Sequence, residues 1–253
     1  MTENSLLAIF IYSLIQGITE FIPVSSSAHL NIIENFINNS EKRNLLFETT
    51  AHMSTILALL LYLVRHSESS LKDLFLNNYK LIVISMIPAL IVGFLFKMFD
   101  VNFFSLKIIA VTSIIGAIML FGADKLNKIK MTINSPLVEF SIAGLFQCLA
   151  FLPGFSRSGS CITAFLLLGK KKEQAINNSL LMSFPIIILS FLSNIKDINT
   201  IEINLDLVLI FVISFLSAYF TLFFFIKYIN KIGFTPYIIY RIFLGLMILF
   251  YLN

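Results

Sequence analysis

The chain has 253 residues, of which 58% are hydrophobic, only 13% are charged and 27 are phenylalanine. This composition excludes an ordinary soluble domain and is typical of a helical membrane protein with several spans. The formal net charge of +4 comes from Lys and Arg residues scattered over short loops, so we expect charges that orient the chain in a membrane and no nucleic-acid partner.

The first half is predicted to form one helical hairpin followed by three membrane spans. An apolar helix is expected over about residues 5–22, and the next helix, about 25–36, is too short and polar to cross a bilayer of about 30 Å. These two helices are predicted to form a re-entrant hairpin, which must face protein or water and not lipid. Spans are expected at roughly 49–64, 80–96 and 104–123.

The first hairpin carries polar side chains in a segment that is otherwise apolar. Gln16 and Glu20 are four residues apart, so they project from one face of a helix that ends near Pro23. The serines that follow are typical of a helix N-cap, so a second helix begins at about Ser25. A carboxylate is therefore expected at a helix break, where unpaired backbone N–H groups point.

Ser26 and His29 are three residues apart and share one face of this second helix. With Glu20 beside them, they form a candidate set of nucleophile, base and acid. Ser25 is assigned to capping and substrate contact, and Ser27 to a supporting hydrogen bond. Gln16 either hydrogen-bonds the helix break or holds a metal ion or phosphate.

The second half repeats this order after a basic loop. Its hairpin and three spans are expected at about 137–152, 160–169, 179–193, 205–228 and 236–252. Each half would cross the membrane an odd number of times, which inverts the second half relative to the first. We therefore predict an all-α polytopic membrane protein: one domain, 1–253, made of two inverted repeats, 1–123 and 137–253, with six transmembrane helices and two re-entrant hairpins.

A second polar break follows Gln147 in the second hairpin. Pro153 and Gly154 end one helix, and a serine-flanked arginine, Arg157, precedes the next. A guanidinium presents a fork of donors suited to phosphate oxygens, and a helix N-terminus adds backbone N–H groups. The residues predicted to bind an anion here are Gly154, Ser156, Arg157 and Ser158. The inverted arrangement would bring them opposite the polar residues of the first break.

Lys and Arg residues are more numerous in the loops on the side opposite both termini, for example Lys125, Lys128 and Lys130. That side should be cytoplasmic, so both termini are predicted to face outward. Arg157 and Arg241 are the arginines expected at membrane depth, where a charge is a functional-site hypothesis by default. We interpret Arg241 as an anchor of the helix bundle.

The two breaks resemble the motifs of the undecaprenyl-diphosphate phosphatase family of bacterial inner membranes, the integral-membrane type associated with bacitracin resistance. The first motif, Glu/Gln-x-x-x-Glu followed by Pro-Val-Ser-Ser-x-x-His, is matched by Gln16, Glu20, Pro23, Ser25, Ser26 and His29. The second motif, Pro-Gly-x-Ser-Arg-Ser-Gly, is matched by Pro153, Gly154, Ser156, Arg157, Ser158 and Gly159. Two further stretches, at residues 47–48 and 234–241, extend the resemblance over nearly the whole chain.

Two positions depart from the commoner family pattern. Gln16 stands where the family also admits Glu, which removes one candidate metal ligand. His52 stands where the family more often carries Gln. We interpret His52 as a packed polar group of the bundle.

This resemblance implies hydrolysis of undecaprenyl diphosphate to undecaprenyl phosphate and inorganic phosphate at the outer face of the bacterial inner membrane, which recycles the lipid carrier of cell-wall synthesis. Ser26 is predicted as the nucleophile, with His29 as general base or orienting partner and Arg157 clamping the diphosphate. Glu20 either fixes the imidazole or binds a metal ion. The family's dependence on a divalent cation implies Mg²⁺ or Ca²⁺ at Glu20, held largely by substrate oxygens and water.

Several alternatives stay open at this point. Direct attack by His29, through a phosphohistidine, is one of them. A transporter or flippase for an anionic lipid is another, because inverted repeats with broken helices are also a transporter architecture. An alanine at Ser26 or His29 should abolish turnover in an enzyme, whereas a carrier should tolerate it. The sequence determines neither the metal, the prenyl length, the presence of a homodimer, nor translocation of the product.

Overall fold

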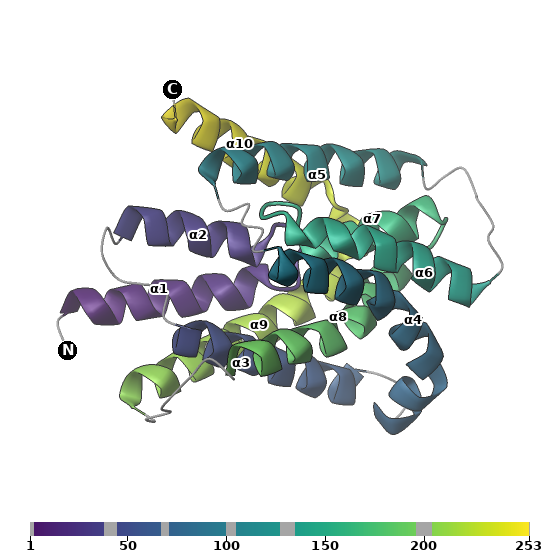
Figure 1. Ribbon diagram of the computed structural model, residues 1–253, viewed down its shortest axis with the longest axis horizontal. Helices are drawn as coiled ribbons and strands as arrows, with labels where there is room; N and C mark the ends of the chain where they lie inside the picture. The colour runs from purple at the N-terminus through teal and green to yellow at the C-terminus, as the bar shows by residue number, and fades with distance from the viewer. Residues whose placement is uncertain are drawn as a thin grey trace.

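The computed structural model describes residues 3–37, 45–66, 71–99, 105–126, 135–195 and 204–252, and this described part of the chain is helical, with no strand (Figure 1). The helices of the first half are α1 (Glu3–Thr19), α2 (Ser26–Ile37), α3 (Leu45–His66), α4 (Leu71–Met98) and α5 (Leu106–Leu126). Those of the second half are α6 (Pro136–Gln147), the short 3-10 helix η1 (Cys148–Phe151), α7 (Arg157–Leu167), α8 (Lys172–Ile195), α9 (Leu205–Ile232) and α10 (Thr235–Tyr251). Both halves follow the predicted order of a hairpin and three further helices.

The prediction of an all-helical polytopic membrane protein is confirmed. Within the described ranges, α3, α4, α5 and α9 are long and apolar enough to cross a membrane. Large apolar side chains such as Leu90, Phe94 and Phe243 lie exposed on the helix surfaces, as expected of residues that face lipid. Because α8 and α10 are not among those four helices, the count of six crossings stays a prediction.

Two helix boundaries beside the breaks differ from the prediction for local reasons. α1 ends at Thr19 and not near residue 22, because Pro23 has no N–H group to donate to the Thr19 carbonyl. α7 begins at Arg157 and not at residue 160. Ser156 caps it there, since Ser156 Oγ accepts a hydrogen bond from the Gly159 N–H at 3.2 Å.

The start of α4 and the loop between the halves also bear on the predictions. α4 begins at Leu71, well before the expected start near residue 80, because an apolar stretch marks only the membrane-embedded part of a longer helix. Lys128 and Lys130, two of the basic residues used to orient the chain, lie outside the described residues.

The two hairpins enter from opposite ends of the molecule, and their tips meet in its middle (Figure 1). Hydrogen bonds join the tips directly. The Gly154 N–H donates to Ser25 Oγ at 3.3 Å, and Ser158 Oγ donates to the Ile22 carbonyl at 2.9 Å. The structure therefore brings the two polar breaks, far apart in sequence, into one place.

Packing between the halves is reciprocal. α1 packs against α9, and α6, which holds the matching place in the second half, packs against α4. α5 packs against α10 and α3 against α8, so that each of these helices meets its own counterpart. Glycines allow both close approaches: a Cβ at Gly17 would collide with the Ser214 carbonyl of α9, and one at Gly144 with the Ser85 carbonyl of α4.

A fully buried arginine of α10 ties both tips to the rest of the bundle. Arg241 Nη1 donates to the Pro23 carbonyl at 3.4 Å, and Nη2 donates to the Gly154 and Phe155 carbonyls at 2.9 Å each. The side chain is 0% exposed, so carbonyl dipoles of both breaks must balance its charge. This arrangement agrees with the interpretation of Arg241 as an anchor.

Gly116 of α5 makes room for this guanidinium. A Cβ added to Gly116 would overlap Arg241 Nη2, whereas one added to Gly122 of the same helix would meet no atom within 4 Å. Gly116→Ala is therefore expected to lower the free energy of unfolding by about 1–3 kcal/mol through overpacking. Gly122→Ala should leave it unchanged or raise it. Thermal unfolding of both variants in detergent checks this, and equal midpoints would mean that Arg241 moves aside without cost.

Candidate active site

A cavity of about 640 Å³ opens where the two tips meet. The polar residues that line it are Glu20, Ser25, Ser26, Ser27, His52, Lys97, Gln147, Ser156 and Arg157. Its apolar walls come from α4, η1 and α8, and they include the exposed side chains of Leu90, Phe94, Phe151 and Leu189. The cavity thus joins a polar pocket to an apolar surface.

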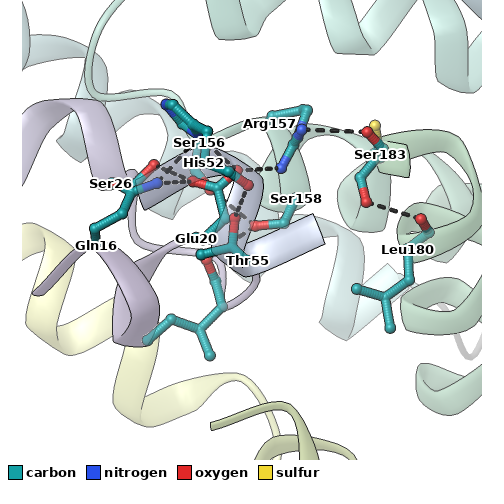
Figure 2. A network of polar contacts seen from close by, with 12 residues as sticks. Gln16, Glu20, Ser26, His52, Thr55, Ser156, Arg157, Ser158, Leu180 and Ser183 are labelled. Atoms are coloured by element: carbon teal, nitrogen blue, oxygen red, sulfur yellow. Dashed lines mark hydrogen bonds and ion pairs between the residues drawn. The ribbon is translucent and has the colours of Figure 1, made fainter. Parts of the chain in front are cut away.

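Glu20 holds the polar end of the cavity together (Figure 2). Its Oε1 accepts a hydrogen bond from Arg157 Nη2 at 2.8 Å, which joins the first break to the second. Its Oε2 accepts hydrogen bonds from Ser26 Oγ at 2.9 Å and from Gln16 Nε2 at 3.0 Å. Glu20 is only 5% exposed, and a carboxylate buried to this extent needs such partners. The structure brings these four predicted residues into one cluster.

Arg157 begins α7 and lines the cavity. Besides its ion pair with Glu20, its Nη1 donates to the Ser183 carbonyl of α8 at 3.5 Å (Figure 2). Its Nε is buried and has no hydrogen-bond partner among the described residues. A guanidinium with an unused N–H group in a cavity can still receive an anionic oxygen.

Ser25 and Ser156 occupy matching places at the two breaks, and both have a left-handed backbone. Their φ angles are 74° and 68°, which is uncommon for residues that carry a side chain. Each caps the helix that follows: Ser25 Oγ accepts from the Ala28 N–H at 3.4 Å, and Ser156 Oγ from the Gly159 N–H. This strained backbone places the N-termini of α2 and α7 at the same cavity, where their dipoles favour an anion.

The other predicted contacts divide into two kinds. Ser27 lines the cavity, with its hydroxyl 3.3 Å from Ser25 Oγ. Ser158 and Gly154 are not among the described residues that line it. The Ser158 hydroxyl is bonded to the first tip, and Gly154, whose φ of 102° favours glycine, donates its N–H to Ser25. These two residues join the tips to each other.

His29 points away from this cluster. Its Nδ1 lies 2.6 Å from the Ser25 carbonyl, so Nδ1 carries the hydrogen. Its Nε2 then accepts the hydroxyl hydrogen of Tyr240 from α10 at 2.6 Å, and the two rings are stacked. Both ring nitrogens are thereby engaged, and the structure does not bring His29 to Ser26.

His52 occupies the place beside Glu20 that we predicted for His29. From α3, its Nδ1 lies 3.1 Å from Gln16 Nε2 and 3.8 Å from Glu20 Oε1. One N–H of the Gln16 amide is used by Glu20, so the other donates to Nδ1 and the hydrogen of His52 lies on Nε2. The interpretation of His52 as a packed polar group did not predict its contact with Gln16 and Glu20. The signal was its i, i+4 spacing from Glu48 in an apolar helix, which puts both side chains on one face.

Gln147 is a second cavity residue outside the predicted site, because the sequence interpretation gave it only a hydrogen bond to its helix break. It is the last residue of α6 and is 2% exposed. Its Oε1 accepts a hydrogen bond from Cys161 Sγ at 3.6 Å, while its Nε2 is buried without a partner among the described residues. Its place before the second break matches that of Gln16 before the first, and this match was visible in the sequence.

The fit of a divalent cation depends on the ligands near Glu20. The described residues contain no group of three or more His, Cys, Asp or Glu side chains that could hold a metal ion. Both oxygens of Glu20 already accept hydrogen bonds. A cation bound at Glu20 would have to displace one of these hydrogen bonds, and substrate oxygens and water would have to supply the rest of its shell.

The polar end of the cavity thus combines a buried carboxylate, a partly buried guanidinium and a partly buried serine hydroxyl with apolar walls, a combination that suits a ligand with a charged head and an apolar tail. The family model of the bacitracin resistance protein BacA matches residues 9–247. The chain belongs to that family.

Curated relatives match nearly the whole chain. The undecaprenyl-diphosphatase of Vesicomyosocius okutanii subsp. Calyptogena okutanii is 34% identical over 261 residues, which cover 95% of this chain and 97% of the relative. Undecaprenyl-diphosphatase 1 of Pseudoalteromonas translucida is 37% identical over 265 residues, with 98% and 99% covered. The undecaprenyl-diphosphatase of Alcanivorax borkumensis is 34% identical over 258 residues, with 96% and 97% covered. The family resemblance predicted from the two motifs is confirmed.

Proposed function

We propose that this chain hydrolyses undecaprenyl diphosphate to undecaprenyl phosphate and inorganic phosphate. One observation carries the proposal: the polar end of the cavity, where Glu20 bonds both Ser26 and Arg157, continues into apolar walls at the exposed helix surface. A lipid diphosphate is divided in the same way, because its charged headgroup matches the polar end of the cavity and its hydrocarbon tail matches the apolar walls. The full-length relatives are named undecaprenyl-diphosphatases, which supports this substrate.

The apolar walls of the cavity offer the tail a route that stays in hydrocarbon. They include Leu90 and Phe94 of α4, Phe151 of η1 and Leu189 of α8, whose side chains are between 37% and 68% exposed. The diphosphate can therefore reach the polar pocket without moving the tail into water, which would cost about 25 cal/mol for each Å² of apolar surface exposed. Lys97 of α4 also lines the cavity, and its charge attracts an anionic headgroup.

Ser26 is the proposed nucleophile. Its hydroxyl donates to Glu20 Oε2, so this carboxylate is placed to accept the proton as Oγ attacks the terminal phosphorus. The Oγ–P bond forms while the bond from that phosphorus to the bridging oxygen breaks, which releases undecaprenyl phosphate. Water then hydrolyses the phosphoserine and yields inorganic phosphate.

Arg157 is the proposed clamp for the diphosphate. Its Nη2 is bonded to Glu20, and its Nε–H has no partner among the described residues, so one guanidinium can hold the carboxylate and a phosphoryl oxygen at the same time. Charge on the oxygens of the transferred group is stabilised by such a cation and by backbone N–H groups. The N-termini of α2 and α7 supply N–H groups at the cavity.

His29 is proposed to orient Ser26 and not to attack phosphorus. Its Nδ1–H holds the carbonyl of Ser25, the residue before the nucleophile, and Tyr240 occupies its Nε2. The imidazole thereby supports the left-handed turn that directs Ser26 toward Glu20. With both nitrogens engaged, this arrangement leaves no lone pair for a phosphohistidine.

Glu20 is proposed to hold a divalent cation, Mg²⁺ or Ca²⁺, together with the diphosphate. Such a cation, when bound, neutralises charge on the phosphoryl oxygens. We expect EDTA to abolish phosphate release. No ligand cluster surrounds Glu20 in the described residues. The dissociation constant of Mn²⁺ from the substrate-free protein, measured by electron paramagnetic resonance, should therefore exceed about 0.1 mM. Tight Mn²⁺ binding that is lost in Glu20→Gln would instead show that the protein alone forms the metal site. Phosphate release that persists in EDTA would exclude a role for the cation.

We further propose that the chain crosses the bacterial inner membrane six times as two inverted repeats, with both termini outside and the cavity open to the outer side. The reciprocal contacts of α1 with α9 and of α6 with α4 support the repeat, as do the paired backbones of Ser25 and Ser156. Release on the outer side would return the lipid carrier to cell-wall synthesis. A membrane-impermeant maleimide should label a cysteine introduced at Leu252 in intact cells, and protection of that cysteine would contradict this orientation.

Phosphate release from a long-chain prenyl diphosphate by the purified protein in detergent tests the proposed function. Release is expected from the diphosphate and not from the corresponding monophosphate, which lacks the anhydride bond. If folded protein binds the lipid diphosphate but releases no phosphate, the proposal fails, and a carrier for anionic lipids becomes the better description.

A further inference from the structure

One polar group of the cavity has no task in the proposed chemistry. Gln147 lines the cavity at the end of α6 and is almost fully buried. Its Nε2 has no hydrogen-bond partner among the described residues. Burial of an amide N–H without a partner costs free energy, so groups left in this state in a native protein call for an explanation.

Arg157 presents the same feature in the same cavity, because its Nε is also buried without a partner in the described part of the chain. The two orphan groups are both donors, so the ligand that satisfies them must be rich in acceptors. The carboxylate oxygens of Glu20 already accept hydrogen bonds from Gln16, from Ser26 and from Nη2 of Arg157. Phosphoryl oxygens of a diphosphate supply several acceptors within a small volume.

The matching glutamine of the first break makes the contrast clear. Gln16 uses one N–H on Glu20 and the other on His52, so its amide serves to orient protein groups. In the described part of the chain, Gln147 hydrogen-bonds only through its Oε1, which accepts from the weak thiol donor Cys161. Its N–H groups are therefore left for a ligand.

We infer that Gln147 is a substrate-binding residue, whose Nε2–H donates to a phosphoryl oxygen of the diphosphate that Arg157 Nε–H also holds. The inference rests on the proposed function, and it assigns Gln147 to the same headgroup. The hydrogen bond from Cys161 Sγ to Oε1 orients the amide and leaves Nε2–H for an anion, which would repel the carbonyl end and attract the N–H end.

Steady-state phosphate release from a long-chain prenyl diphosphate tests this with three variants. Gln147→Leu removes the donor, so KM should rise about tenfold or more while kcat changes less. Gln147→Glu keeps the shape but sets a carboxylate against the diphosphate, so kcat/KM should fall further than in Gln147→Leu. Gln174→Leu is the matched control, because Gln174 lies in the first turn of α8 and does not appear among the described lining residues; its KM should equal that of the wild type.

A KM within about twofold of the wild type in Gln147→Leu would overturn the inference, as would a loss of kcat at unchanged KM, which indicates a structural role. If Gln147→Leu fails to fold, as judged by its thermal midpoint, the nearly isosteric Gln147→Glu decides, and wild-type kcat/KM in that variant contradicts the assignment. Absence of release from the wild type is a different result, since it counts against the proposed function and not against Gln147 alone.

Discussion

Ser26→Ala is expected to lower kcat for phosphate release by at least about a thousandfold, because it removes the atom that attacks phosphorus. Binding of the lipid diphosphate should persist, since Arg157, Gln147 and the helix N-termini at the cavity are unchanged. Single-turnover phosphate release and equilibrium binding of the lipid, measured on the same preparation, separate the two effects.

Ser141→Ala is the matched control for this variant. Ser141 lies partly exposed on α6, and its hydroxyl donates to the Leu137 carbonyl of the same helix. Its loss should leave kcat and KM unchanged. If Ser26→Ala keeps more than about a tenth of the wild-type kcat, a loss of less than about 1.4 kcal/mol in transition-state stabilisation, Ser26 is not the nucleophile.

Arg157→Ala is expected to lower kcat/KM by about 10³ to 10⁵, the range found for arginines that stabilise phosphoryl transfer. The variant loses the clamp on the diphosphate and also the partner of Glu20 at 2.8 Å. Arg157→Lys keeps the charge but not the fork of donors, so it should recover only part of the activity. Phosphate release by both variants is measured at saturating substrate, which gives kcat, and at limiting substrate, which gives kcat/KM.

The ion pair with Glu20 requires its own control. Removing Arg157 leaves a buried carboxylate without its cation, which is expected to cost about 3–5 kcal/mol of stability. The thermal midpoint of Arg157→Ala must therefore be measured beside its kinetics, and Glu20→Gln/Arg157→Ala should regain stability without regaining activity. An Arg157→Ala protein that is folded and keeps kcat/KM within about tenfold of the wild type would contradict the clamp.

Much of the site could be predicted because its backbone causes are local. Pro23 and Pro153 interrupt helices wherever they stand, and polar side chains such as Glu20 and Arg157 in apolar segments must find partners inside the protein. Together with the inverted arrangement of the two halves, these facts predict one carboxylate and one guanidinium at two helix breaks that meet, and the structure places them 2.8 Å apart.

The remaining features depend on contacts between distant helices, which spacing in the sequence does not reveal. His29 is turned away by Tyr240, which lies 211 residues further along the chain. His52 reaches Glu20 because the packing of α3 carries it there. From the sequence, Ser25 and Ser156 are expected to be ordinary N-caps, for which an extended backbone is typical. In the structure their φ angles are 74° and 68°. We attribute this difference to the contact between the two tips.

The measurement that tests the central claim most directly is rapid quenching of the wild-type protein with terminally radiolabelled undecaprenyl diphosphate, followed by peptide mapping of the labelled protein. The predicted result is an acid-stable phosphoserine on the peptide that contains Ser26, formed at least as fast as phosphate is released and absent from Ser26→Ala. An acid-labile label on His29, or single-turnover release from Ser26→Ala at the wild-type rate, would contradict the claim that Ser26 attacks the diphosphate held between the two helix breaks.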